Sequence, residues 1–149
     1  MNEGAAILSD LITEMMGELI YKYDLTLVPY DKEEAYLVGS NFGLRFVAEW
    51  EGVDLTYIAQ NGKGGWSEYY PRVLLENRFK PQDRLAYGQP QCRAAIRAAS
   101  LRVHASAITR EFDDVLRGDQ KWLNKERAYI RDLDRARCLA ISNAMLGRS

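Results

Sequence analysis

The sequence predicts an α+β protein: an N-terminal helix, an antiparallel β-meander of three to four strands, and a C-terminal antiparallel helical hairpin. Apolar residues recur every three or four positions over residues 6–23 and again over 90–147. Between residues 24 and 60 they alternate with polar residues instead. Because the strands form one block and 149 residues suit one core, residues 1–149 are expected to form a single domain.

The first helix is predicted over residues 6–23. One side of it is apolar and would face the core, through Ile7, Leu8, Leu11, Ile12, Met15, Leu19 and Ile20. Asp10, Glu14 and Glu18 fall on the opposite, polar side. This segment is therefore an amphipathic helix that packs one face on the sheet.

The clearest strand pattern is a hairpin of two alternating runs, residues 42–50 and 53–59, that flank Glu51-Gly52. A two-residue loop at Glu51-Gly52 would pair Trp50 with Val53 and keep the apolar residues of both runs on one face. The opposite face would then place Glu49 against Asp54, a like-charge pair.

The segments around this hairpin are shorter and less regular. Residues 35–39 and 25–28 have the composition of two more strands. We expect a turn over 61–65, a short helix over 73–77 and a loop over 80–90.

The C-terminal part has the most regular helical period in the chain. The helix predicted from Pro90 carries inward-facing Ala94, Ala98, Leu101, Ala105, Ile108, Phe112 and Val115. Gly118 would end it, and Asp119 would cap a second helix reaching to about Gly147. That second helix would turn Trp122, Tyr129, Leu133, Ala136 and Ala140 inward and complete the helical hairpin.

No motif in the chain predicts a reaction. His104 is the only histidine and has no nucleophile or carboxylate nearby in the sequence to complete a catalytic pair. The glycines of 61–65 lack the Gly-Lys-Ser/Thr of a phosphate loop. Cys92 and Cys138 belong to no metal-binding pattern. We therefore expect a non-enzymatic protein with no cofactor and no metal.

The net charge of −1 conceals two opposite halves. Residues 1–60 hold 11 acidic and 3 basic residues, which gives −8, whereas residues 61–149 hold 10 acidic and 17 basic residues, which gives +7. In the acidic half, tyrosines accompany the carboxylates, and tyrosine is enriched in protein interfaces. The predicted partner-binding residues are Tyr30, Asp31, Glu33, Glu34, Tyr36, Glu49, Glu51 and Asp54.

The basic half supports a second hypothesis, a nucleic-acid-binding regulator. Arg127, Arg131 and Arg135 would form one row on the second C-terminal helix. Nucleic-acid-binding domains usually have a pI above about 9, whereas this chain has a pI of about 5.9. We therefore favour basic helices that meet the acidic half, either within one molecule or in a homodimer.

The termini and the cysteines predict the compartment. The N-terminus lacks the basic start and apolar run of a signal peptide, and no window of 18 residues is apolar enough to cross a membrane. Two separated cysteines are typical of reduced thiols. These features predict a cytoplasmic protein with no membrane partner.

Three stretches of the sequence are similar to those of a known protein family. They are the first helix that leads through Leu19–Tyr23 into the hairpin Phe42–Ala59, the sequence Glu68-Tyr69-Tyr70-Pro71, and Val115–Asp119 between two helices. In this order of parts the chain resembles small cytoplasmic immunity proteins of bacterial toxin–immunity systems, including contact-dependent growth inhibition. The resemblance implies a protein that binds and neutralises one cognate toxin and has no catalytic activity of its own.

Overall fold

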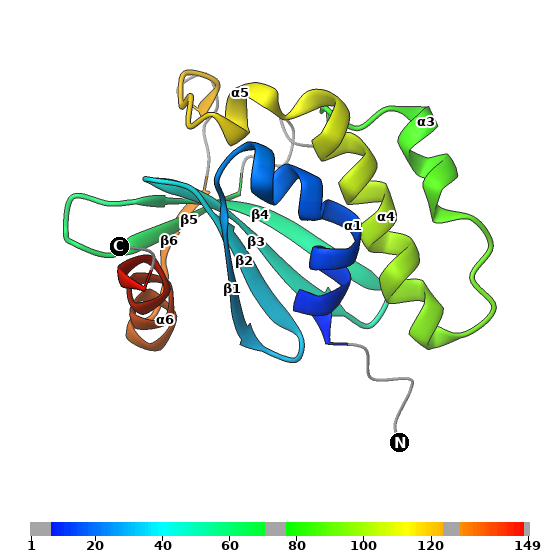
Figure 1. Cartoon of the computed structure of the whole chain (residues 1–149), viewed down its shortest axis with the longest axis horizontal. Coiled ribbons are helices and arrows are strands. Elements are labelled where there is room, and N and C mark those ends of the chain that lie inside the picture. Colours follow the sequence, from blue (N-terminus) through cyan, green and yellow to red (C-terminus); the bar gives the residue numbers. More distant parts are fainter. Residues whose placement is uncertain (1–6, 71–76, 124–128, 148–149) are drawn as a thin grey trace.

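The computed structural model describes residues 7–70, 77–123 and 129–147 (Figure 1). Its elements, in chain order, are α1 (Leu8–Lys22), β1 (Thr26–Asp31), β2 (Glu34–Val38), β3 (Phe42–Glu49), β4 (Gly52–Gln60), β5 (Trp66–Tyr70), α3 (Pro81–Arg84), the 3₁₀ turn η1 (Leu85–Tyr87), α4 (Arg93–Glu111), α5 (Asp113–Leu116), β6 (Tyr129–Asp132) and α6 (Arg135–Leu146).

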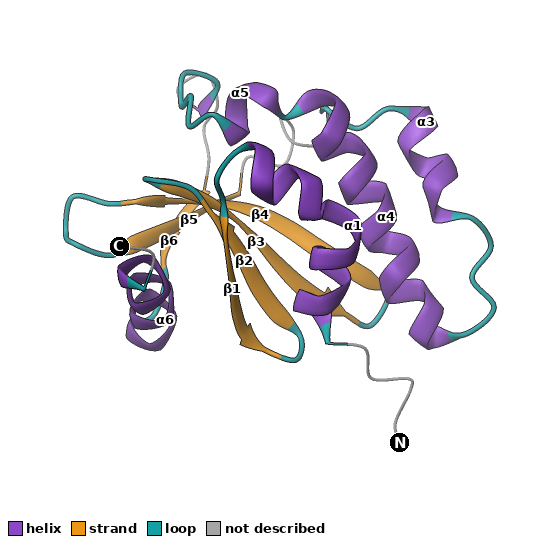
Figure 2. Ribbon diagram, viewed as in Figure 1, coloured by secondary structure: helices purple, strands orange, loops and turns teal. Residues whose placement is uncertain are grey.

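The strands form one antiparallel sheet in the order β1-β2-β3-β4-β5-β6, so each strand pairs with its neighbours in the sequence. Helices α1 and α4 lie on one face of this sheet and α6 lies on the other (Figure 2). The predicted α+β class and N-terminal helix are confirmed. The sheet has two strands more than the predicted maximum of four, because β5 and β6 extend it at one side.

The larger core lies between the sheet and α1 with α4. Alternate residues of β3 and β4, such as Phe46 and Tyr57, point into it because successive side chains of a strand face opposite sides. Tyr57 is fully buried, its ring contacts Trp122 edge-on with 4.7 Å between centroids, and its hydroxyl accepts a hydrogen bond from Gln120. Burial raises the pKa of Tyr57 to about 12, so it is neutral. A smaller core joins α6 to the other face through Ile141 and Leu133.

The register of the β3–β4 hairpin differs from the prediction by two residues. Val53 pairs with Ala48 instead of Trp50, and Glu49 pairs with Gly52, so the turn is Trp50-Glu51. Asp54 then lies opposite Val47, and the predicted Glu49–Asp54 pair is absent from the ladder. A shift of two keeps the same residues on each face, so the predicted core face is unchanged.

Gly52 explains this register. A Cβ added to Gly52 would lie 2.7 Å from the Ser100 hydroxyl oxygen on α4, and its φ of +157° is one that other residues rarely adopt. The close approach of α4 therefore requires glycine at the first residue of β4. Because Gly52 belongs to the strand, the two-residue turn is Trp50-Glu51 instead of the predicted Glu51-Gly52.

The predicted C-terminal helical hairpin is wrong. Helix α4 ends at Glu111, the short α5 follows, and Gly118 turns the chain with φ +87°. Residues 129–132 then form β6 along β5, and α6 follows on the opposite face of the sheet from α4. Tyr129 is consequently exposed, whereas Trp122 and Leu133 are buried as expected. The predicted helix 73–77 lies, apart from Asn77, outside the described residues.

We predict that Gly52→Ala lowers the free energy of unfolding by about 1–3 kcal/mol, because the added methyl displaces Ser100 and strains the backbone. Urea unfolding followed by circular dichroism measures this change. The matched control is Gly17→Ala in α1, where no atom lies within 4 Å of the added Cβ. There we expect a gain of about 0.5–1 kcal/mol from helix propensity. Equal effects of the two substitutions would contradict the role given to Gly52.

Candidate functional site

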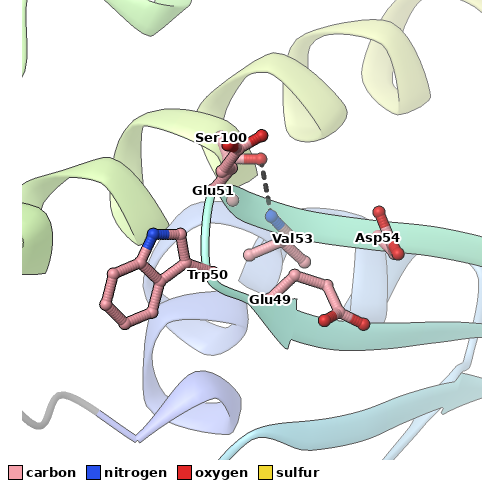
Figure 3. A pocket seen from close by; sticks show the side chains of 7 residues that line it. Glu49, Trp50, Glu51, Val53, Asp54 and Ser100 are labelled. Carbon is pink, nitrogen blue, oxygen red and sulfur yellow. Dashed lines mark hydrogen bonds between the residues drawn. The ribbon is translucent and has the colours of Figure 1, made fainter.

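The end of the β3–β4 hairpin carries an exposed acidic surface around a tryptophan. Glu49, Glu51 and Asp54 line a depression of about 610 Å³, together with Trp50 and Ser100. Figure 3 shows Glu49 and Asp54 on the two strands and the Trp50 indole projecting from the turn. Trp50 is 72% exposed, although tryptophan is usually well buried.

The turn between β1 and β2 adds a fourth carboxylate. The Glu33 carbonyl accepts a 2.7 Å hydrogen bond from the Ala48 amide, which brings this turn beside the hairpin. Glu33, Glu49 and Trp50 line a second depression of about 410 Å³, whose rim also includes Arg97. We define the acidic tip as Glu33, Glu49, Trp50, Glu51 and Asp54.

Helix α4 holds the acidic tip through both backbone groups of Val53. The Val53 amide donates to the Ser100 hydroxyl over 2.8 Å, and the Val53 carbonyl lies 2.5 Å from His104 Nε2. Burial lowers the pKa of His104, and the hydrogen bond to Val53 opposes this only in part. A neutral imidazole bonded to a carbonyl carries its proton on Nε2. Ser100 and His104 are four residues apart, so both lie on the face of α4 that meets the strand.

The eight predicted binding residues fall into two groups. Asp31, Glu33, Glu49, Glu51 and Asp54 are exposed at this end of the sheet, and Asp31 accepts the Glu33 amide at 2.8 Å. Tyr30, Glu34 and Tyr36 point to the other face, where α6 packs. Glu34 and Tyr36 are 4% and 0% exposed, so their inclusion in an accessible surface is wrong. Tyr30 is partly covered by the Arg137 guanidinium, 4.6 Å from the ring centroid.

On that face the buried Glu34 belongs to an ion-pair network of four side chains, namely Glu34, Arg45, Glu68 and Arg137. Arg45 donates to Glu34 over 3.0 Å and to Glu68 over 2.7 Å. Arg137 reaches Glu34 from α6, 103 residues away in sequence, with distances of 2.7 and 2.9 Å. Tyr36 also donates to Glu34. The network therefore joins β2, β3, β5 and α6.

Both glutamates of the network are ionised. Burial alone would raise the pKa of Glu34, but hydrogen bonds from Arg137, Arg45 and Tyr36 outweigh it and lower the pKa to about 2. The pKa of Glu68 is also lowered, because Thr56, Tyr70 and Arg45 donate to it and overcome the effect of burial. A cleft of about 360 Å³ borders the network, but its three arginines, Arg45, Arg131 and Arg137, all donate to these glutamates. Among the described residues that line it, the cleft therefore offers no unpaired cation to an anion.

Two residues of this region, Glu68 and Trp50, are not among the eight predicted site residues. Glu68 lies in a stretch with no clear period, and its burial follows from the pairing of β5 with β4 and β6. Trp50 was expected on the apolar face, and it reaches the surface because the hairpin register moves by two. Gly52, the second residue of the predicted turn, was the available signal, because only a glycine fits where α4 approaches the strand.

The basic residues do not form the predicted helical row. Arg131 lies on β6, Arg135 begins α6, and Arg127 lies outside the described residues. Other arginines pair with nearby carboxylates, as Arg78 does with Asp114 and Arg117 does with Asp113. The nucleic-acid hypothesis thus loses the row of charges on which it depended.

The described part of the chain contains neither a metal-binding cluster nor a membrane-spanning helix. Among residues 7–70, 77–123 and 129–147, no three His, Cys, Asp or Glu side chains gather as a metal site would require. No helix in these ranges has both the length and the apolar character of a membrane span.

We predict that Glu34→Gln lowers the free energy of unfolding by about 3–5 kcal/mol at pH 7, because it leaves Arg45 and Arg137 without their shared counter-ion. The wild type should also lose about 3 kcal/mol of stability as the pH falls from 4.5 toward 2, since the unfolded chain takes up that proton first. The variant should lack this part of the acid dependence. Urea unfolding at several pH values measures both effects.

The matched control is Glu33→Gln, one residue away, where the side chain is 68% exposed and lies 3.8 Å from Arg97. An exposed pair of this kind contributes about 0–1 kcal/mol. A loss at Glu34 as small as the loss at Glu33 would show that the network does not hold the fold.

Comparison with known proteins adds no family assignment, since no protein-family model, curated protein or solved structure matches the chain.

Proposed function

We propose that this protein is a non-catalytic binding protein that neutralises a cognate bacterial toxin, and that a positively charged surface of the toxin docks on the acidic tip. The single observation that carries this proposal is the exposed Trp50 at the end of an anchored hairpin, surrounded by Glu33, Glu49, Glu51 and Asp54. Such a protein would act in the cytoplasm, where a toxin delivered into the cell meets its target.

Trp50 has the properties of an interface anchor. An indole offers a large apolar area at low cost in conformational entropy, and tryptophan is enriched among residues that dominate binding energy. Ser100 and His104 hold Val53, two residues after the turn, to α4, so little backbone order has to be gained on binding. This arrangement favours a protein partner over a small molecule, because Trp50 projects from the turn instead of lining an enclosed cavity.

The carboxylates around Trp50 favour a partner with a positively charged surface. The four acidic side chains of the tip surround Trp50, and Arg97 lies at the rim. Complementary charge speeds association and excludes partners of the same sign. A nuclease fits this requirement, because an enzyme that holds phosphates is positively charged around its site.

We predict that Trp50→Ala weakens binding by about 2 kcal/mol or more, roughly thirtyfold, because the indole is the apolar centre of the surface. The triple variant Glu49→Lys, Glu51→Lys, Asp54→Lys should abolish protection and slow association, most strongly at low salt. Growth during co-expression with the protein encoded by the adjacent reading frame measures protection. Surface plasmon resonance with the same protein measures affinity and rates.

The matched control for charge is Asp10→Lys, Glu14→Lys, Glu18→Lys, which changes the net charge equally on the exposed side of α1. This variant should protect as well as wild type. If the tip variant, shown to be folded, protects fully, the surface is assigned wrongly. If the adjacent protein neither harms the cell nor binds, the proposed function itself is wrong.

A further inference from the structure

The two edges of the sheet differ in how they are protected from pairing. Strand β1 has Pro29 in its middle, its register shifts between Pro29 and Asp31, and α6 packs against it. Proline, irregular register and a covering helix all prevent another strand from adding to an edge. In the described chain, β6 has none of these features.

Strand β6 is instead an exposed edge with apolar side chains. All four of its residues, Tyr129–Asp132, are exposed, and Tyr129 and Ile130 are 70% and 54% exposed. Among the strands that the structure describes, β6 pairs with β5 alone. An exposed edge of this kind presents unpaired amide and carbonyl groups to any strand that approaches.

The pairing with β5 identifies which backbone groups are available. The Leu133 amide donates to the Trp66 carbonyl over 2.9 Å, and these two residues continue the β5–β6 register. Bonded pairs alternate along an antiparallel ladder, so Arg131 and Tyr129 also direct their backbone groups to β5. The amide and carbonyl of Ile130 therefore point away from the sheet, at the centre of the free edge.

We propose that β6 pairs with β6 of a second copy of this chain, antiparallel and with the two-fold axis at Ile130, to give a dimer with one continuous sheet. In this arrangement Ile130 exchanges both backbone hydrogen bonds with Ile130 of the partner subunit. The inference is independent of the toxin-binding proposal, because the acidic tip lies on other strands.

The side chains of β6 are complementary to themselves in this register. On one face of the sheet, the two Ile130 side chains meet at the axis, which pairs apolar with apolar. On the other face, Tyr129 lies opposite Arg131 of the partner subunit, and an arginine over a tyrosine ring is a favourable cross-strand pair. Such a symmetric contact closes after two copies and does not propagate into a fibre.

The register with the axis at Arg131, which the backbone also allows, is unfavourable. Centring the axis on Arg131 would place two arginines directly opposite each other at the closest spacing in the ladder. Arg131 already donates to Glu68 over 3.4 Å within its own chain, and one carboxylate would then face two guanidinium groups. The axis at Ile130 avoids this repulsion and keeps three strand residues paired in each copy.

The first experiment is sedimentation velocity of the full chain over a range of concentrations. The mass of the wild type should rise from 17.0 kDa toward twice that value as the concentration increases. Ile130→Lys should stay at one chain at every concentration, because two lysines would meet at the axis. The matched control Leu139→Lys, on α6 with a similar exposure of 48%, should associate as the wild type does. A wild type that stays at 17.0 kDa, or an Ile130→Lys variant that dimerises equally, would overturn the proposal.

The second experiment tests the register and does not depend on the lysine variant folding. In a Cys92→Ser background, which removes the exposed native thiol, Ile130→Cys should form a reducible dimer under mild oxidation. Its two thiols would sit on Cα atoms about 5.5 Å apart, within the range for a disulfide. Asp132→Cys should not crosslink, because the two copies of residue 132 would lie about 13 Å apart. Equal crosslinking at both positions, or none at residue 130, would contradict the pairing.

Discussion

The rest of this structure depends on the position of Arg45, a cation near the centre of the sheet. It bridges Glu34 on β2 and Glu68 on β5, and these two glutamates then receive Arg137 from α6 and Arg131 from β6. A charge removed from water is costly unless it is paired and hydrogen-bonded. Each glutamate here accepts bonds from at least three donors, so the network can form only when all these elements are in place.

The two faces of the sheet differ in polarity because the ion-pair network lies on one of them. One face is apolar and packs against α1 and α4, and its register is set where Gly52 meets Ser100. The other face carries the ion pairs, with a small apolar patch under α6 around Ile141. As a result, the charged side chains near the middle of the sheet form ion pairs within the molecule, and those at the end of the β3–β4 hairpin remain at the surface.

The two faces explain which acidic residues of 1–60 are paired within the molecule and which are exposed. Glu34 counts among the acids of residues 1–60, yet it is neutralised by an arginine from the basic half. The Arg137–Glu34 pair joins the two parts within one molecule, whereas Arg78, Arg110, Arg117 and Arg131 pair with carboxylates of the basic half itself. The carboxylates of the acidic tip are the acids for which an external partner is proposed, and the exposed Trp50 gives that partner an apolar contact. The proposed dimer through β6 involves a separate edge of the sheet, two strands away from the hairpin.

The sequence by itself determined the local structures whose periods are regular. Residues 8–22 are a helix and residues 42–60 contain a hairpin, as predicted. Their buried faces include Leu8, Ile12 and Leu19 of the helix and Phe46 and Tyr57 of the hairpin, whereas Ile7 and Trp50 are exposed and Met16 is buried, against expectation. Only the tertiary structure decided the rest. The hairpin register depends on a helix about 50 residues away, and the burial of Glu34 and Tyr36 depends on Arg137, 103 residues away. Residues 129–132 have a pattern compatible with a helix, but they form a strand that pairs with β5. In this position their backbone forms hydrogen bonds with β5, and Arg131 forms an ion pair with Glu68. Local spacing carries no information about such distant partners, and distant partners decide which charges are buried and which remain available for binding.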